Sequence, residues 1–383
     1  MTYLEAALEV LNLIETHSFQ AFFVGGFVRD HILGIEANDI DIATNALPSQ
    51  IANIFEVVNT GIKFNSVTIL YQGYEFETTT YRIDLDYKDN RHPVCCVADS
   101  LVDDLKRRDF TINAMAMDKN FKIVDIFDGQ KDLDNKIIRT VYDPIKRFTE
   151  DALRMLRACY FAAKLDFTIA NDTLDAIKKS SHLIQCLSND RILWELEKIV
   201  KSKNPMKGFD YLLTTNILPY LLLFKDGISL IIEKDIHDLN WVLFLCLCFY
   251  SNPEALNEIH IKAELRRQIS DSIELSRKAL KNDFDNIELF DYGLEIALLA
   301  NQINVYQRNS KDNSVKIKSN YDKLVIHSMI ELNLKAQDII DGVKLQNKKS
   351  INEILLDVKE KVLNKKIDNN REKILKYIKK YYS

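Results

Sequence analysis

The stretch that decides the fold reads GGFVRD at residues 25–30 and DIDIAT at residues 39–44. The apolar run from Ala21 to Val24 leads into the glycines and predicts a buried strand. A Gly-Gly pair directly after a strand lets backbone N–H groups approach a phosphate, because no Cβ stands in the way. The second segment predicts another strand, over residues 39–43.

Two acidic residues alternate on that second strand. Alternate residues of a strand point to the same face, so Asp39 and Asp41 are expected to present their carboxylates side by side. Two like charges held this close need a cation between them, and hard oxygen ligands suit Mg²⁺. Either motif alone is weak, because Gly-Gly is usually a turn and Asp-x-Asp occurs by chance in acidic loops. Together, in this order and context, they predict a nucleotidyltransferase with Asp39 and Asp41 as catalytic metal ligands.

The composition is that of a globular protein without membrane segments. The chain has 383 residues, of which 47% are hydrophobic and 28% charged, enough for two to four domains or for one head with a helical remainder. No secretory signal pattern opens the chain, and its longest apolar run, Trp241 to Tyr250, is far shorter than a membrane span. Six cysteines occur without a Cys-x-x-Cys motif. We therefore expect a cytoplasmic, reduced protein.

The charge is unevenly distributed along the chain. The net charge of −5 argues against an obvious nucleic-acid binder. Residues 344–383, however, carry 12 Lys and Arg against 5 Asp and Glu, a balance of +7 that leaves −12 for residues 1–343. This basic end is either a surface that contacts phosphates or an amphipathic helical end with solvated lysines, and charge alone leaves both open.

The periodicity of apolar residues divides the chain into a mixed part and a helical part. A helix is predicted over residues 4–16 and another over residues 48–55, opened by Pro48. Strands are predicted over residues 22–24, 40–43, 66–71 and 75–81. After Asp143-Pro144 the strand patterns end and the spacing stays helical. The pattern thus predicts an α/β head of about 140 residues followed by an all-helical remainder.

A second constellation is basic. Residues 106–108 are three consecutive cations, and they lead into FTINAMAM at residues 110–117, which we expect to be buried and helix-like. Arginine at the edge of a packed element suits bidentate phosphate binding, although a solvated basic turn is the common alternative. Asn113 lies within the buried stretch and needs a polar partner, which a ribose or a phosphate would supply.

A third constellation, RFTEDALRMLR at residues 147–157, predicts a helix with Thr149 as its cap. Ordinary surface salt bridges from Glu150 and Asp151 to Arg154 are one interpretation. The other is recognition of a base. A carboxylate accepts from the exocyclic amine of cytosine or adenine while an arginine donates to the neighbouring ring nitrogen. Uracil and guanine present the reversed pattern, so Asp151 with Arg154 would select C and A without a nucleic-acid template.

These motifs resemble a known family. GGFVRD with DIDIAT, RRDFTINAMA at 107–116 and DPIKRFTEDALRMLRA at 143–158 are similar to class II tRNA nucleotidyltransferases and bacterial poly(A) polymerases, and within that family to the CCA-adding enzymes. The resemblance implies an α+β chain: a nucleotidyltransferase-type head at 1–140, a helical neck at 141–205, and a helical body with a basic, tRNA-binding tail at 206–383. It also implies addition of C, C and A to the 3′ end of tRNA from CTP and ATP, with release of pyrophosphate, by two-metal in-line attack of the 3′-hydroxyl.

The resemblance also implies roles for individual residues. Asp39 and Asp41 would hold Mg²⁺, with Glu77 as a weaker acidic candidate, and Arg108 would act with them in catalysis. The nucleotide-binding residues would be Gly26, Arg29, Arg108, Asn113, Glu150, Asp151, Arg154 and Arg157.

Some features leave alternatives open. Tyr160 stands where the family usually has an arginine, which puts one nucleotide contact in question. CC-adding enzymes and poly(A) polymerases share the head, but the segment from Tyr81 to Pro93 looks intact and favours the full activity. A catalytically inactive head kept for RNA binding would have lost a carboxylate or the basic motif, and both are present. The oligomeric state, monomer or homodimer, stays open.

Overall fold

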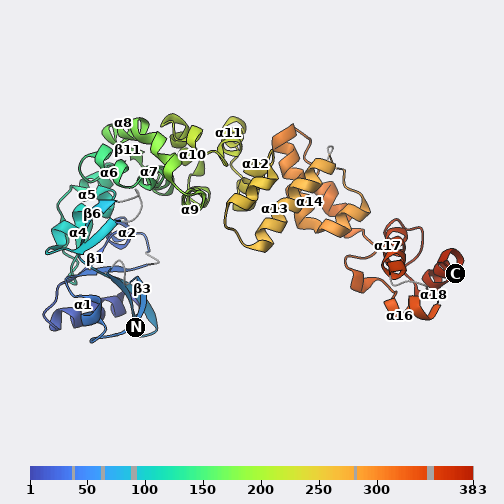
Figure 1. Ribbon diagram of the computed structural model, residues 1–383, viewed down its shortest axis with the longest axis horizontal. Helices are drawn as coiled ribbons and strands as arrows, with labels where there is room; N and C mark the ends of the chain where they lie inside the picture. The colour runs from blue at the N-terminus through green and yellow to red at the C-terminus, as the bar shows by residue number, and fades with distance from the viewer. Residues whose placement is uncertain (37–38, 62–64, 88–92, 280–282, 343–348, 383) are drawn as a thin grey trace. The chain divides into compact units, whose positions relative to one another are not determined.

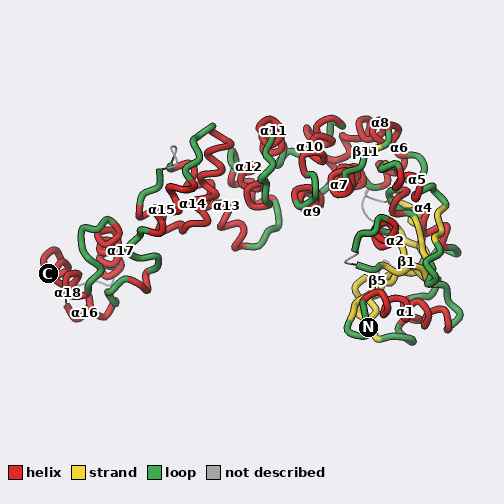
Figure 2. The backbone as a smooth tube through the Cα atoms, turned by 180° about the vertical axis from the view of Figure 1, so that it is seen from behind, coloured by secondary structure: helices red, strands yellow, loops and turns green. Residues whose placement is uncertain are grey.

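The computed structural model describes residues 1–36, 39–61, 65–87, 93–279, 283–342 and 349–382. The chain forms two compact units, residues 1–225 and 226–383, each with its own buried apolar cluster. All strands of the described residues belong to the first unit, and the second unit is built from helices (Figure 1; Figure 2). The α+β class predicted from the sequence is confirmed.

The first unit is built on a seven-stranded sheet with the order β3-β4-β5-β2-β1-β8-β9. The strands are β1 (Ala21–Val24), β2 (Asp41–Thr44), β3 (Glu56–Gly61), β4 (Ser66–Tyr71), β5 (Tyr74–Thr80), β8 (Met115–Met117) and β9 (Ile123–Asp125). The β2–β5 pair is parallel and the other pairs of this sheet are antiparallel. Strands β1 and β2 lie side by side in the centre with Val24 opposite Asp41, so the two opening motifs meet at one edge of the sheet.

Two further strand pairs and ten α-helices, α1 to α10, belong to the described part of the first unit, together with short 3₁₀ turns. Strands β6 (Arg82–Tyr87) and β7 (Pro93–Val97) form one pair, and β10 (Ile137–Ile138) and β11 (Thr168–Ile169) form the other. The helices are α1 (Tyr3–Thr16), α2 (Gly26–Ile32), α3 (Pro48–Ile51), α4 (Leu101–Lys106), α5 (Gly129–Asp134), α6 (Pro144–Glu150), α7 (Leu153–Leu165), α8 (Asn171–Ser180), α9 (Asn189–Val200) and α10 (Pro205–Thr214).

Helix α1 confirms the first predicted helix. Thr2 caps it, and its hydroxyl accepts from the Glu5 amide while the Glu5 carboxylate accepts from the Thr2 amide. The apolar face is buried, and the Tyr3 ring stacks on Phe76 of β5 with centroids 5.2 Å apart. The helix is therefore fixed both by its own cap and by the sheet.

Several predicted elements differ from the structure. Strand β2 begins at Asp41, so Asp39 precedes it instead of sharing it, and α3 ends at Ile51, four residues before the predicted end at 55. The stretch after the basic motif is a short 3₁₀ turn, Thr111–Asn113, followed by strand β8, and it is not an α-helix. All three β8 residues are fully buried between β1 and β9, and a strand buried on both faces has the continuous apolar pattern of a buried helix.

The predicted helical remainder also needs two corrections. Strand β11 lies beyond Asp143, where only helices were predicted, and it pairs in parallel with β10 of the head. Two residues are too short to leave a strand pattern in the sequence. The predicted single helix over residues 147–157 is two helices, α6 and α7, separated at Asp151-Ala152 because Asp151 has an extended backbone (φ −147°, ψ 105°).

The second unit has a helical core. Its described helices are α11 (Lys225–Lys234), which starts on the last residue of the first unit, α12 (Trp241–Phe249), α13 (Ala263–Lys278), α14 (Asn286–Arg308), α15 (Ser314–Asp322), α16 (Ala336–Gly342), α17 (Lys349–Leu363) and α18 (Arg371–Tyr382). Helix α12 confirms the buried apolar run, and burial raises the pKa of its Cys246 and Cys248 thiols. Among the helices described, none combines the length and the apolar character needed to cross a bilayer.

Candidate nucleotide-binding and catalytic site

Carboxylates converge at the edge of the sheet where β2 and β5 run in parallel. Asp41 lies directly opposite Glu77 in the register, and Asp39 is exposed just before β2. Burial, followed by the charge of Glu77, raises the pKa of Asp41 to about 6, with Asp39 acting in the same direction and Arg108 against it. The three carboxylates therefore repel one another, and a bound divalent cation would relieve that repulsion.

The donors at this edge fit a magnesium ion shared with a substrate. Within the described part of the chain, no three or more His, Cys, Asp and Glu side chains form a complete metal cage. Mg²⁺ is commonly held by one or two carboxylates, with substrate phosphates and water completing its shell. Asp41 with Asp39 supplies such a partial set. The predicted pair thus fits the ion, although the two residues do not share a strand as predicted.

Gly25 shapes the turn that faces these carboxylates. Its backbone has φ +69° and ψ −128°, a conformation that side-chain-bearing residues rarely adopt. A Cβ at Gly25 would lie 3.0 Å from Nη1 of Arg108 and 3.8 Å from Oδ2 of Asp41. At Gly26 a Cβ would meet only Arg29 Nη2, at 3.6 Å. The glycine that the geometry requires is therefore Gly25, which sequence reasoning did not name as a site residue.

The basic motif is held by one buried carboxylate. Asp104 of α4 accepts from Arg107 Nε at 2.9 Å and Nη2 at 2.8 Å, and from Arg108 Nη2 at 3.0 Å. Burial acts to raise the pKa of Asp104, but the charges of Arg108 and Arg107 outweigh it and hold the pKa below its usual range. Arg107 and Arg108 are thus fixed, not solvated as in the alternative. The Arg108 Nε is buried and has no hydrogen-bond partner among the described residues.

Asp104 was not identified from the sequence as a residue that supports the site. The signal that points to it is its position three and four residues before the two arginines, on the same helical face. The partly buried guanidinium of Arg108, with an unused N–H and close to Asp41, is a donor placed for an anion. Arg108 therefore faces the carboxylate edge with capacity for a phosphate oxygen.

A chain of polar contacts joins α2 to α7. Arg29 donates through Nη1 to Asn113 Oδ1 at 2.7 Å, and Asn113 Nδ2 donates to Asp109 Oδ1 at 3.1 Å. Arg157 then donates through Nε to Asp109 Oδ2 at 2.8 Å. Burial acts to raise the pKa of Asp109, and the Arg157 charge with the hydrogen bonds it accepts holds it below the usual range. The sequence predicts a ribose or a phosphate as the polar partner of Asn113. In the structure its partners are protein groups, so Asn113 does not need a ligand to be hydrogen-bonded.

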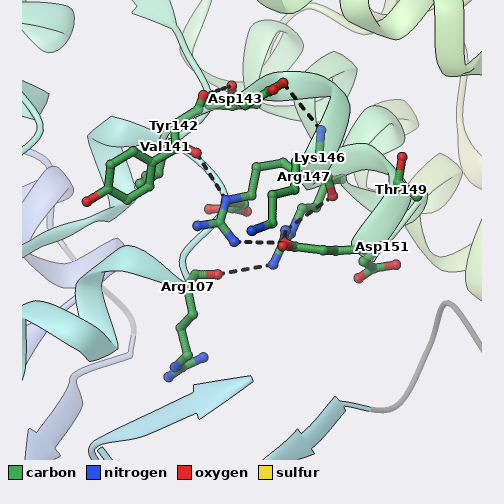
Figure 3. A network of polar contacts seen from close by, with 12 residues as sticks. Arg107, Val141, Tyr142, Asp143, Lys146, Arg147, Thr149 and Asp151 are labelled. Atoms are coloured by element: carbon green, nitrogen blue, oxygen red, sulfur yellow. Dashed lines mark hydrogen bonds and ion pairs between the residues drawn. The ribbon is translucent and has the colours of Figure 1, made fainter. Parts of the chain in front are cut away.

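Side chains at the carboxyl end of α6 and the start of α7 form hydrogen bonds with the backbone of the basic motif (Figure 3). Arg147 donates through Nε to the Val141 carbonyl at 3.0 Å, and Arg147 Nη2 donates to the Lys106 carbonyl. Glu150 accepts from Arg147 Nη1 at 2.7 Å and from Arg154 Nη1 at 2.9 Å. Arg154 Nη2 also donates to the Arg107 carbonyl at 3.1 Å, which the dashed line beside Arg107 in Figure 3 marks. Glu150 thus holds two arginines in place.

Asp151 occupies the break between α6 and α7. Its Oδ1 accepts from the amide of Leu153, the first residue of α7, at 3.1 Å. Arg191 of α9 donates through Nη2 to Asp151 Oδ1 at 3.0 Å and Oδ2 at 3.3 Å. The predicted cap Thr149 does not cap a helix: its hydroxyl donates back to the Ile145 carbonyl, and Asp143 caps α6. After Gly25 and Asp104, Arg191 is the third residue of this site to which the sequence analysis assigned no role.

These groups line one cavity of about 610 Å³, a size typical of ligand sites. Its acidic lining residues are Asp41, Asp109 and Asp151, and its basic ones are Arg29, Arg82, Arg107, Arg108, Arg154, Arg157, Lys164 and Lys198. The excess of positive charge suits a triphosphate. Of the ten residues predicted from the sequence, eight line the cavity: Gly26, Arg29, Asp41, Arg108, Asn113, Asp151, Arg154 and Arg157.

The remaining two predicted residues are placed differently. Glu150 lies behind the cavity wall, bound to Arg147 and Arg154, and Asp39 is exposed at its edge. Tyr160, which replaces the arginine usual in the family, does line the cavity. The segment from Tyr81 to Pro93 includes residues 88–92, which lie outside the described residues.

Comparison with known proteins places the chain in a family. Residues 21–139 match the poly A polymerase head domain, residues 166–225 match a probable RNA and SrmB-binding site of polymerase A, and residues 234–378 match a putative tRNA nucleotidyltransferase domain 2. A CCA-adding enzyme of Ligilactobacillus salivarius (strain UCC118) is 38% identical over 98% of this chain and 96% of its own length. One of Staphylococcus haemolyticus (strain JCSC1435) is 35% identical over 97% of both.

A solved structure agrees with the sequence relatives. The CCA-adding enzyme of Bacillus stearothermophilus in complex with CTP superposes with a TM-score of 0.84 at 28% identity, covering 99% of this chain and 98% of that one. The likeness extends over both units and is not confined to the head. The family predicted from the motifs is confirmed, and the chain belongs to the CCA-adding enzymes, which are tRNA nucleotidyltransferases.

Proposed function

We propose that this chain adds C, C and A in turn to the 3′ end of tRNA, using CTP and ATP and releasing pyrophosphate. The observation that carries this proposal is the composition of the cavity. One pocket joins a carboxylate edge and fixed arginines to a separate carboxylate–arginine pair that matches C and A. We further propose that the reaction takes place in the cytoplasm, which agrees with the free cysteines among the described residues.

Asp39 and Asp41 are the residues that would hold Mg²⁺ in this function, with Glu77 close by. Bound there, the ion would lower the pKa of the attacking 3′-hydroxyl and neutralise charge on the phosphates. The protein's own contribution is to keep these carboxylates next to the turn at Gly25. Burial first, and then repulsion from Glu77, raise the pKa of Asp41, and such an ion would oppose both by favouring the charged carboxylate.

Arg108 and Arg29, with the backbone at Gly26, would bind the triphosphate. Asp104 fixes Arg108, whose buried Nε is left without a partner among the described residues, and Asn113 and Asp30 fix Arg29. Groups held in place before the reaction stabilise developing charge better than mobile ones. Phosphoryl transfer of this kind depends mainly on positioning and electrostatics, so no covalent intermediate and no protein base are required.

Asp151 and Arg154 would read the base. The Asp151 carboxylate would accept from N4 of cytosine or N6 of adenine, and Arg154 would donate to N3 or N1. Arg191 holds the carboxylate and Glu150 holds the arginine, so both sit in defined positions before a nucleotide arrives. Arg157, bound to Asp109 beside the Phe161 ring, supports the same wall. A uracil or guanine would leave these groups wrongly paired.

We propose that the segments of the chain have the functions that the resemblance implies. The head at 1–140 would hold metal and triphosphate, the neck at 141–205 would read the base, and the body and basic tail at 206–383 would bind tRNA. In the tail, α17 and α18 bury apolar residues such as Val358 and Ile374, and Lys376, Lys379 and Lys380 of α18 would be available for phosphate contact.

The test is incorporation of labelled CTP and ATP, separately and together, into tRNA that lacks its 3′ CCA, with Mg²⁺ present. Two C followed by one A, and then arrest, is the expected product. Addition of C alone would make the chain a CC-adding enzyme, and a long A tail on unrelated RNA would make it a poly(A) polymerase. No incorporation by the intact chain would overturn the proposal.

A further inference from the structure

A second cavity of about 490 Å³ lies next to the nucleotide cavity in the first unit. It is lined by residues of α7 and α9, helices that pack on each other (Figure 1), and of the segment that follows α9. It shares Tyr160, Lys164 and Lys198 with the first cavity. We call it the Trp194 surface, after the residue of α9 that forms its outer wall. A molecule bound there would extend directly into the site where the nucleotide reacts.

The Trp194 surface presents aromatic rings to solvent. The Trp194 residue is 67% exposed, which is unusual for a side chain with so much apolar area. Tyr160 is partly exposed, and Lys198 Nζ lies between the two rings, 5.1 Å from the centroid of Trp194 and 5.7 Å from that of Tyr160. An exposed tryptophan beside cations is the arrangement on which unpaired bases stack.

The charge around these rings is positive. The cavity is lined by four lysines, Lys164, Lys198, Lys201 and Lys203, and by one acidic residue, Glu197. Glu195 lies beneath and fixes Lys198 at 2.8 Å, and Glu197 pairs with Lys201 at 2.5 Å. Lys164 makes no ion pair with any described residue. Stacking rings flanked by lysines match the two parts of a single-stranded nucleotide chain, its bases and its phosphates.

We propose that the Trp194 surface binds the unpaired 3′ end of the RNA acceptor and directs its terminal hydroxyl into the nucleotide cavity. The inference rests on the proposed function and names the place where its second substrate sits. The incoming nucleotide fits the first cavity better than it fits the Trp194 surface. Its triphosphate is matched by Arg29 and Arg108 and its base by Asp151 and Arg154, all of which line only the first cavity.

The first experiment uses Trp194 as its own reporter. The chain has two tryptophans, so Trp241→Phe leaves Trp194 as the only one. Emission is followed while tRNA lacking its CCA end is added without nucleotide, and in parallel while CTP is added without RNA. We expect quenching by the RNA, saturating at the Kd found by filter binding, and little change with CTP. RNA binding without quenching, or quenching by CTP equal to that by RNA, would overturn the inference.

The second experiment measures affinity with the full chain. Trp194→Ala is expected to raise the KM for tRNA roughly tenfold while leaving the KM for CTP unchanged, because one base–aromatic stack is lost. Trp194→Phe is expected to restore most of the affinity, since it keeps a ring. Ile126→Ala removes another exposed apolar side chain of the first unit, one in the head and outside both cavities, and serves as the matched control.

The outcomes separate this inference from the proposed function. If Trp194→Ala adds CCA with an unchanged KM for tRNA, the Trp194 surface is not the acceptor site and the function stands. If the unmodified chain adds nothing to tRNA, the function fails, and the fluorescence titration still decides whether the Trp194 surface binds RNA.

Discussion

The two sides of the nucleotide cavity are built on opposite electrostatic principles. On the phosphate side, made by Gly25, Asp41 and Arg108, the compensation is incomplete: burial and Glu77 raise the pKa of Asp41, and Arg108, although paired with Asp104, keeps an Nε without a partner within the described chain. On the base side, made by Asp151 and Arg154, each group is already in an ion pair, with Arg191 and with Glu150.

The difference indicates what each side leaves for the substrate to supply. A triphosphate with its cation would complete the phosphate side, so this side is strained without substrate. In the proposed function, the base side discriminates among bases that differ in the direction of two hydrogen bonds. A groove that adapted its shape to each base would lose that discrimination. The phosphate side, where a carboxylate and an N–H group lack partners, thus suits binding by charge. The base side, where each charged group is already paired, suits selection by geometry.

The largest expected effect comes from Asp41. Asp41→Ala should lower kcat on the order of 10³-fold, because the cation would lose its better-buried ligand. The same substitution should raise the unfolding temperature measured in EDTA, because it removes a buried carboxylate together with its repulsion from Glu77 and Asp39. Both are measured with CTP incorporation and thermal unfolding of one preparation.

A lower kcat together with a higher unfolding temperature is what we expect if the phosphate side is strained without substrate. The control is Asp175→Ala, which removes an exposed carboxylate of α8 away from the cavity and should change neither quantity. If Asp41→Ala is less stable than the unmodified chain in EDTA, the phosphate side is not strained, and the contrast between the two sides fails.

On the base side the expected effect is on selectivity. Asp151→Ala should reduce discrimination against UTP and GTP about 100-fold, because the acceptor for the exocyclic amine is lost. Unlike Asp41→Ala, it should also lower stability by about 1–3 kcal/mol, since Arg191 is left without its carboxylate. Misincorporation with single nucleotides and urea denaturation measure the two effects.

Arg191→Lys sharpens this test. The lysine keeps a charge but not the donor geometry that holds both carboxylate oxygens, so selectivity should fall partway while metal-dependent binding of triphosphate stays unchanged. Unchanged selectivity in Asp151→Ala would remove the base-reading role from this side of the cavity.

Most of the site that lies within contiguous motifs was predictable from the sequence. Gly-Gly after an apolar strand, Asp41 in an Asp-x-Asp pair and the arginine run each have a local physical meaning. Arg191 was not given a role, because it lies 40 residues beyond Asp151 and meets it only through the packing of α9 on α7. Strand β8 was mistaken for a helix because burial on both faces removes the alternation that marks a strand.

A third prediction separates backbone strain from close approach. Gly25 and Gly34 have nearly equal positive φ, +69° and +67°, but a Cβ at Gly34 meets nothing within 4 Å. Gly34→Ala should cost about 1 kcal/mol of folding stability through its backbone alone. Gly25→Ala should cost about 1–3 kcal/mol and also lower kcat, because the methyl group displaces Arg108. Equal losses in both variants, with full activity, would show that the turn at Gly25 does not shape the phosphate side.

The smallest expected effect is a loss of folding stability in acid, to which one carboxylate from each side of the cavity contributes. Asp104 supports the phosphate side and Asp109 supports the wall that holds Arg157. Although burial opposes it, neighbouring arginines hold both pKa values below the usual range. Carboxyls with a lowered folded pKa stabilise the fold fully above the unfolded pKa of about 3.9, and this stabilisation is lost as the pH falls further through the folded values.

The free energy of unfolding should therefore fall more steeply below about pH 4 in the unmodified chain than in either Asn variant. Asp104→Asn and Asp109→Asn should each lower the plateau at pH 6 by about 1–3 kcal/mol and flatten the acid limb, whereas Asp175→Asn should leave both unchanged. Urea denaturation at pH 6, 4 and 3 measures this. If Asp104→Asn flattens the limb and Asp109→Asn does not, the ion pair of Asp109 with Arg157 adds little, and the fixed character of the base side comes from Arg191 and Glu150 alone.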